Sequence, residues 1–99
     1  MNSKQRSFLK GIAMTTEPIF QIGKSALTPE LTTAVGEALE KRELVKISVL
    51  QNCLDDPKDM AARLAARTQS EVVQVIGKKI VLYRQAKEEK HRKIVLPRG

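Results

Sequence analysis

The segment Gly23-Lys24-Ser25-Ala26 has the residue types that could hold a phosphate group. It follows a short apolar run and precedes a helix start at Thr28. Glycine lets a ligand approach the backbone closely, lysine supplies a positive charge, and the start of a helix presents free N–H groups. An ordinary strand-to-helix turn with an exposed lysine would look the same, so both interpretations stay open. The segment is not a nucleotide-binding P-loop, because Pro18 stands where that motif requires its first glycine.

Further cations lie near both ends of the chain and could extend such a site. The candidates are Lys4, Arg6, Lys10, Lys78, Lys79 and Arg84. The whole chain has 18 Lys and Arg against 11 Asp and Glu, a formal net charge of +7, and its acidic residues gather in the middle. This distribution favours a polyanionic partner on one side of the molecule. Gly77-Lys78-Lys79 could contact phosphate, but most sequences of this kind are simply solvated hairpin turns.

Catalytic and metal-binding patterns are not apparent in the sequence. His91 and Cys53 are the only residues of their types, and neither has a partner at metal-ligand spacing. The acidic residues around Asp56 precede a helix, where capping explains them. We therefore expect no catalytic residue, no metal and no cofactor. The chain has only three aromatic residues, Phe20 and Tyr83 among them, so recognition by backbone and shape is favoured over base stacking.

The elements that must position these residues follow from caps and periodicity. Ser3 could cap a helix over residues 4–14, and Thr28-Pro29 and Asp56-Pro57 each predict a helix start. Alternating apolar residues predict strands at 19–22 and 44–51. Two further strands, 72–76 and 79–83, are joined at Gly77-Lys78 by a tight turn. The predicted fold is a single-domain α/β sandwich of a mixed four-stranded sheet and three helices, in the order α-β-α-β-α-β-β.

Residues 1–84 form the expected domain, and residues 85–99 form a basic C-terminal tail. This tail could fold over the sheet or be mobile. A single cysteine favours a reducing compartment, the N-terminus lacks the apolar stretch of a signal peptide, and no run approaches the roughly 20 residues that span a bilayer. We expect a cytoplasmic protein without a membrane partner.

Four groups of residues carry a resemblance to a known family. They are Lys4-Gln5-Arg6 with Leu9-Lys10, the run from Pro18 to Lys24 with Leu27-Thr28, Ala38-Leu39-Glu40 with the run from Arg42 to Lys46, and the run from Val73 to Lys78 with Val81-Leu82-Tyr83-Arg84. They occur in order over residues 3–84. In these segments the chain resembles the bacterial stand-alone CRM-domain proteins, the YhbY family of RNA-binding proteins linked to ribosome assembly.

The resemblance implies a fold similar to the C-terminal domain of translation initiation factor three. It also implies RNA binding through a G-x-x-G loop like that of K-homology domains, at Gly23, Lys24, Ser25 and Ala26, with the helix start at Thr28. The sequence departs from the family at Ala26, which replaces the second glycine. If that position requires a left-handed backbone, alanine costs on the order of 1 kcal/mol.

The resulting expectation is a non-catalytic, monomeric protein that binds structured ribosomal RNA or the precursor of the large ribosomal subunit. Assembly of that subunit is the role that the resemblance implies, and no small-molecule substrate is expected. An alternative from another class is a protein-interaction adaptor that binds its partner through the acidic second helix, with Glu30, Glu37 and Glu40.

Overall fold

The structure of the protein is a computed structural model that describes residues 1–98. Its elements are α1 (Ser3–Ala13), β1 (Phe20–Ile22), α2 (Pro29–Arg42), β2 (Leu44–Val49), α3 (Pro57–Thr68), β3 (Glu71–Ile76), β4 (Lys79–Tyr83) and a short 3-10 helix, η1 (Glu89–His91). The predicted order of three helices and four strands is confirmed. Within the described residues, no helix has both the length and the apolar character needed to cross a membrane.

The helix starts follow the caps in the sequence, with one correction. Thr28 and Asp56 cap α2 and α3 as predicted. The cap of α1 is Asn2 and not Ser3, which is already helical. The Asn2 side chain accepts a 2.8 Å hydrogen bond from the Gln5 amide, and the Gln5 side chain accepts a 3.2 Å bond from the Asn2 amide. This reciprocal pair satisfies two helix-end donors, which a cap at Ser3 would not do.

The four strands form one mixed sheet in the order β1-β2-β4-β3. β1 and β2 are parallel and are connected by α2, whereas β4 is antiparallel to both of its neighbours. After β2 the chain forms α3 and then β3. In the sheet, β3 is not next to β2, because β4 lies between them. Gly77, at φ 54°, allows the tight turn between β3 and β4 that the sequence predicted.

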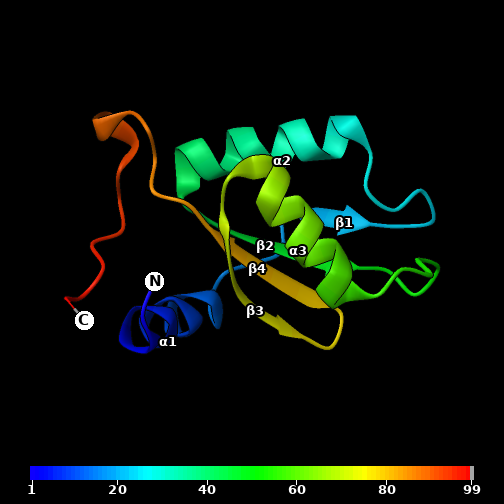
Figure 1. The fold of residues 1–99 in the computed structure, drawn as a ribbon, viewed down its shortest axis with the longest axis horizontal. Helices are drawn as coiled ribbons and strands as arrows, with labels where there is room; N and C mark the ends of the chain where they lie inside the picture. Colours follow the sequence, from blue (N-terminus) through cyan, green and yellow to red (C-terminus); the bar gives the residue numbers. More distant parts are fainter. Residues whose placement is uncertain (99) are drawn as a thin grey trace.

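Helices cover the sheet unequally on its two faces (Figure 1). α2 and α3 lie on one face and bury the main core, which includes Val35, Leu39, Ile47, Leu64, Ile80 and Leu82. α1 lies on the other face, where Leu9 and Ala13 pack against Val73, Val81 and Tyr83. Because α1 is a single short helix, it covers only part of its face.

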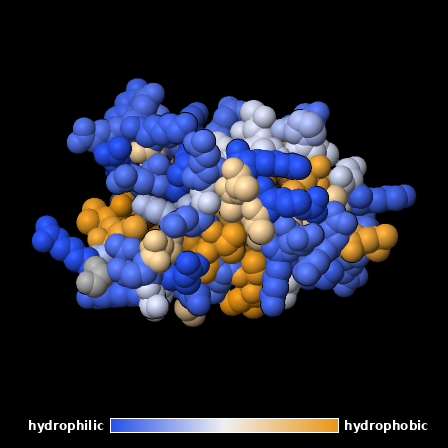
Figure 2. All heavy atoms as spheres, viewed as in Figure 1, coloured by the Kyte–Doolittle hydropathy of each residue, from blue (hydrophilic) through white to orange (hydrophobic). Residues whose placement is uncertain are grey.

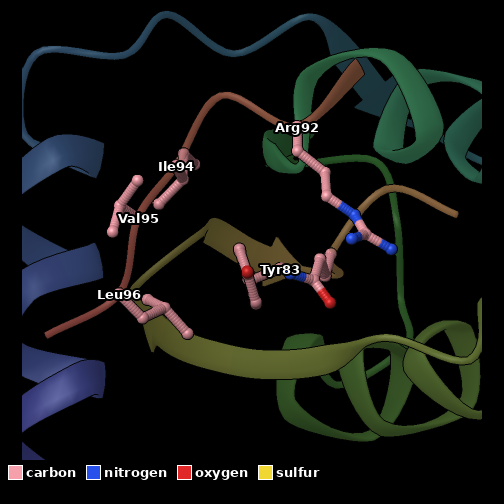
Figure 3. Close-up of a pocket in the computed structure, with 6 residues that line it drawn as sticks. Tyr83, Arg92, Ile94, Val95 and Leu96 are labelled. Atoms are coloured by element: carbon pink, nitrogen blue, oxygen red, sulfur yellow. The ribbon is translucent and has the colours of Figure 1, made fainter. Parts of the chain in front are cut away.

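The C-terminal segment, residues 85–98, lies against the end of α2 and continues across the α1 face. Ile94 and Leu96 pack with α1 and Tyr83 in the second apolar cluster. Figure 3 shows this segment passing over Tyr83, with Arg92 and the apolar side chains around a cavity of about 450 Å³. The segment therefore covers the part of the sheet that α1 leaves free on the side away from the β3–β4 turn.

Candidate functional site

Three loops meet at one edge of the sheet. Because β1 and β2 are parallel, the loops that follow them leave the same edge, and the β3–β4 turn reaches that edge from the other side. The Leu50 amide donates to the Ile22 carbonyl at 2.8 Å, and the Val49 amide donates to the Lys78 carbonyl at 2.7 Å. Neighbouring strands lie about 4.8 Å apart, so the ends of β1 and β4 are separated by about 10 Å. Figure 1 shows the β1–α2 and β2–α3 loops at the right-hand end of the molecule, with the β3–β4 turn below them.

The first of these loops is a turn that presents Lys24. The Ala26 amide donates to the Gly23 carbonyl at 3.0 Å, which leaves Lys24 and Ser25 exposed at the tip. Ala26 itself has φ 54°, in the left-handed region that glycine adopts freely. The loop therefore has the conformation that glycine would allow, although the residue is alanine. Ala26 and Leu27 pack against the main core, and this packing offsets the backbone strain.

Gly23 is not required by the fold around it. Its φ is not positive, and a Cβ atom there would lie 3.6 Å from both Asn52 Oδ1 and Leu50 Cδ1, an ordinary contact distance. Neither strain nor crowding within the protein explains a glycine at this position. The bare backbone leaves space in which an outside group can approach the peptide at the tip.

Thr28 has a positioning role at the start of α2. Its hydroxyl oxygen accepts a 3.1 Å hydrogen bond from the Leu31 amide, and its carbonyl accepts a 3.0 Å bond from the Thr32 hydroxyl. The helix start is therefore fixed directly after the turn. Glu30 is exposed in the same first turn, so an anion here would rest on Lys24 and the turn amides more than on the helix end.

Lys24, Lys78 and Lys79 lie in or next to two of the loops at this edge. All three are exposed, and no salt bridge within residues 1–98 involves them. The Lys79 Nζ donates to the Ser48 hydroxyl at 2.6 Å, which places its ammonium group over the α1 face of the sheet. These cations have no ion-pair partner within residues 1–98, while exposed carboxylates lie at the same end of the molecule, those of Glu30, Asp55 and Asp56.

The three cations of α1 differ in exposure: two face solvent and one is bound inside the protein. Lys10 is exposed one turn before the end of α1, whereas Lys4 is exposed near its beginning. Arg6 is half-buried, and its guanidinium group donates to the carbonyls of Val72 and Val73, where β3 has a bulge. Arg6 thus anchors α1 to β3, and its donors are directed into the protein.

Arg84 lies at the opposite edge of the sheet from the lysines. Its guanidinium group donates to the Thr68 carbonyl at 3.0 Å and to the Gly36 carbonyl at 3.2 Å, and it lies 3.5 Å from Glu40 Oε1. Its Nε atom is buried without a partner in the described residues. The side chain therefore ties α2 to α3 at a place that the structure separates from the exposed lysines.

Two carboxylates, Glu40 in the last turns of α2 and Glu43 directly after it, hold the C-terminal segment, a role that the sequence did not indicate. Glu40 accepts hydrogen bonds from the Lys87 and Glu88 amides and lies 3.1 Å from His91 Nδ1, and these partners, in that order, lower its pKa to about 2. Burial acts to raise the pKa of Glu43, but hydrogen bonds from three backbone amides outweigh it and hold that pKa below its ordinary value.

Lys46 is a further cation that was not among the predicted site residues. Its Nζ donates to the Ala13 carbonyl at 3.1 Å, at the end of α1, where the helix dipole favours positive charge. The signal was present in the alternation of β2, which puts Lys46 on the α1 face. What the sequence lacks is the position at which α1 ends over that face.

Comparisons with known proteins agree on one family. The model of the CRS1 / YhbY (CRM) domain matches residues 1–84. "Probable RNA-binding protein YqeI" of Bacillus subtilis is 46% identical over 90 residues, covering 91% of this chain and 94% of its own. An "RNA-binding protein" of Haemophilus influenzae is 33% identical over 98 residues, with 99% and 96% coverage. A solution structure of a Staphylococcus aureus protein, described as a candidate RNA-binding protein, has a TM-score of 0.79 and 44% identity over 98% of this chain and 99% of that one.

Proposed function

The chain belongs to the CRS1/YhbY (CRM) domain family, and we propose that it is a non-catalytic RNA-binding protein that recognises structured ribosomal RNA. Its work is in the assembly of the large ribosomal subunit, where it acts as a cytoplasmic monomer. RNA binding as the general function rests on the family and on relatives whose names give that function. The finer role in assembly rests on the resemblance to ribosome-linked members of the family.

The observation that carries the mechanism is the lysine edge, which we define as Lys24, Lys78 and Lys79 at the sheet end beside the Gly23–Ala26 turn. Lys24 and the free amides at the tip of the turn hold one backbone phosphate. Lys78 and Lys79, beside the end of a strand two strand positions from β1, hold another part of the same backbone. Phosphate contacts of this kind fix the position of an RNA, while its shape provides the selectivity.

The remaining cations divide into two groups in this proposal. Lys10 and Lys4 extend the electrostatic footprint along α1, because both are exposed. Arg6 and Arg84 contribute through the fold, because their guanidinium groups are bound to backbone carbonyls inside the protein. The adaptor alternative has a smaller acidic surface than the sequence suggests, since Glu40 is occupied by the C-terminal segment and only Glu30 and Glu37 remain exposed.

The test is direct binding to fragments of ribosomal RNA across a salt series, with the wild type, Lys24→Ala and Lys41→Ala side by side. Lys41 is a matched control because it is exposed in the last turn of α2, near the opposite edge of the sheet. Each lost phosphate contact reduces the slope of log K against log salt by about 0.7–0.9. We expect a shallower slope and weaker binding for Lys24→Ala, and no change for Lys41→Ala.

Two results would count against the proposal. Equal slopes for all three proteins would move the phosphate contact away from the Gly23–Ala26 turn. No binding by the wild type, even at low salt, would remove RNA as the ligand and return attention to a protein partner.

A further inference from the structure

The face of the sheet that carries α1 stays open at its end nearest the lysine edge. α1 ends at Ala13, and beyond it lies a cavity of about 160 Å³. Its apolar lining comes from Ala13, Met14, Ile76 and Val81. Met14 is 81% exposed and Ile76 is 63% exposed, so two large apolar side chains stand in solvent at its rim. Figure 2 shows apolar atoms gathered over the region of β3 with hydrophilic side chains around them.

The polar lining of this cavity is cationic or neutral. Lys46, Lys79 and Gln74 complete it, and no carboxylate lines it within the described residues. Lys46 donates to the Ala13 carbonyl and Lys79 to the Ser48 hydroxyl, each through one of the three hydrogens of its ammonium group. Both groups therefore keep donors for a ligand. Gln74 offers an amide that can donate and accept.

The cavity is continuous with the lysine edge. Ile76 and Lys79 are paired across the β3–β4 hairpin, directly next to the turn that carries Lys78. On the other side, Lys10 lies one helical turn before Met14 on the same face of α1. A strand of RNA held at the lysine edge would pass over this cavity if it continued toward α1.

We propose that this cavity holds an unpaired nucleobase of the bound RNA, an inference that rests on the proposed RNA-binding function. The flat face of the base lies on Met14, Ile76 and Val81, and its polar edge meets the Gln74 amide. The phosphates on either side of that nucleotide meet Lys46 and Lys79. A base fits this lining because it combines an apolar face with a polar edge and is flanked by two anions. An apolar side chain of a protein partner would leave both ammonium groups without an anion.

No aromatic residue among residues 1–98 lines this cavity. Phe8 is 42% exposed, but it lies on α1 outside the cavity lining. Tyr83 is only 6% exposed, beneath the C-terminal segment, and Phe20 packs against the main core under α2. Within this cavity, base contact therefore falls to the thioether of Met14 and the side chain of Ile76. Methionine suits that task, since its flexible and polarisable side chain makes favourable contacts with aromatic rings.

The experiment compares an RNA hairpin that has an unpaired loop with the same hairpin carrying abasic nucleotides in that loop. The proteins are the wild type, Ile76→Ser, Lys24→Ala and Val95→Ser. Val95 is a matched control, because it is an 86% exposed aliphatic residue on the C-terminal segment. We expect the wild type and Val95→Ser to prefer the hairpin with bases by about fivefold or more, and Ile76→Ser to lose this preference. Circular dichroism verifies that Ile76→Ser is folded, as the exposure of this residue leads us to expect.

The outcomes separate the two proposals. Lys24→Ala should weaken binding to both hairpins and keep the preference for bases, because it removes a phosphate contact alone. Equal binding of both hairpins by the wild type, or an unchanged preference in Ile76→Ser, would overturn the base site and leave RNA binding intact. Failure of the wild type to bind either hairpin at low salt would overturn the proposed function and the base site together.

Discussion

Glu43, at the end of α2, is joined to Ala86, beyond β4, by a 2.7 Å hydrogen bond from the Ala86 amide to Glu43 Oε2. The other carboxylate oxygen accepts bonds from the amides of Lys93, at 2.7 Å, and Ile94, at 2.9 Å. The Glu43 side chain is fully buried, so three backbone donors converge on one carboxylate that water does not reach. Glu43 therefore fixes two separate stretches of the C-terminal segment, in addition to the contacts that Glu40 makes with Lys87 and Glu88.

Replacing this carboxylate should loosen the segment and weaken the whole fold. Glu43→Gln keeps the shape of the side chain but removes its charge, and its NH₂ group would face a backbone donor. We expect the free energy of unfolding to fall by about 2 kcal/mol, because hydrogen bonds to a buried charge are strong and their loss leaves donors unsatisfied. Denaturant unfolding measures this change, and hydrogen exchange at Ala86 and Lys93 locates it. Glu37→Gln, an exposed change on the same helix, is the control, and equal stability of both variants would contradict the prediction.

Acid should release the same segment. Hydrogen bonds from the Lys87 and Glu88 amides and from His91 lower the pKa of Glu40 to about 2, against an ordinary 4.5. A carboxyl group whose pKa is lower in the folded state stabilises the fold above its ordinary pKa. That stabilisation decreases as the pH falls from about 4.5 toward 2, and Glu43, whose pKa is also lowered, acts in the same direction. Amide NMR shifts of residues 86–94 follow the release. A release that is already complete well above pH 4.5 would contradict the role of these two carboxylates.

Removing the guanidinium group of Arg84 should lower the stability of the protein and leave its RNA binding unchanged. Arg84→Met keeps most of the apolar stem but removes the donors to the carbonyls of Thr68 and Gly36. We expect the free energy of unfolding to fall by about 2 kcal/mol, with the salt slope of RNA binding unchanged. Unfolding curves and the salt series measure the two effects separately. A stable variant with a shallower slope would instead place Arg84 in the RNA interface.

Replacing Ala26, whose backbone is left-handed, by glycine should stabilise the protein. Ala26→Gly relieves the strain at φ 54°, and we expect the free energy of unfolding to rise by about 0.5–1 kcal/mol. The gain is reduced by the lost contact between the Ala26 methyl group and the core. Gln69→Gly is a control with φ 56° at the end of α3, where a similar gain should leave RNA binding unaffected. A less stable Ala26→Gly protein would show that the methyl contact outweighs the backbone strain.

Much of the fold was predictable because its signals are local. Thr28-Pro29 and Asp56-Pro57 determine where two helices begin within a few residues of the signal itself. The alternation from Val45 to Val49 assigns each strand residue to a face, and Gly77 marks the turn that brings β3 and β4 together. From these elements and the parallel crossover, the meeting of the Gly23–Ala26 turn with the Lys78 turn follows.

The roles of individual charged residues were less accessible to sequence reasoning. Arg84 and Lys79 look alike in the sequence, yet Arg84 bonds to Gly36, 48 positions away, and Lys79 stays exposed. In the sequence, Glu43 is one of several carboxylates in and after the second helix. Only the structure shows that it binds Ile94, 51 positions away. Contacts at such separation depend on how packed elements meet, and no local pattern encodes them.

The central position of β4 has a consequence for how the chain comes together during synthesis. β2 and β3 do not touch in the sheet, since β4 lies between them and is the last strand in sequence. A nascent chain that has emerged only as far as β3 lacks the core residues Ile80 and Leu82. In that chain β2 can pair only with the short β1, and β3 has no neighbouring strand. Translation must therefore pass β4 before the sheet can close, so folding is a late and concerted event with long-range contacts, and a chain interrupted before Lys79 remains without its tertiary structure.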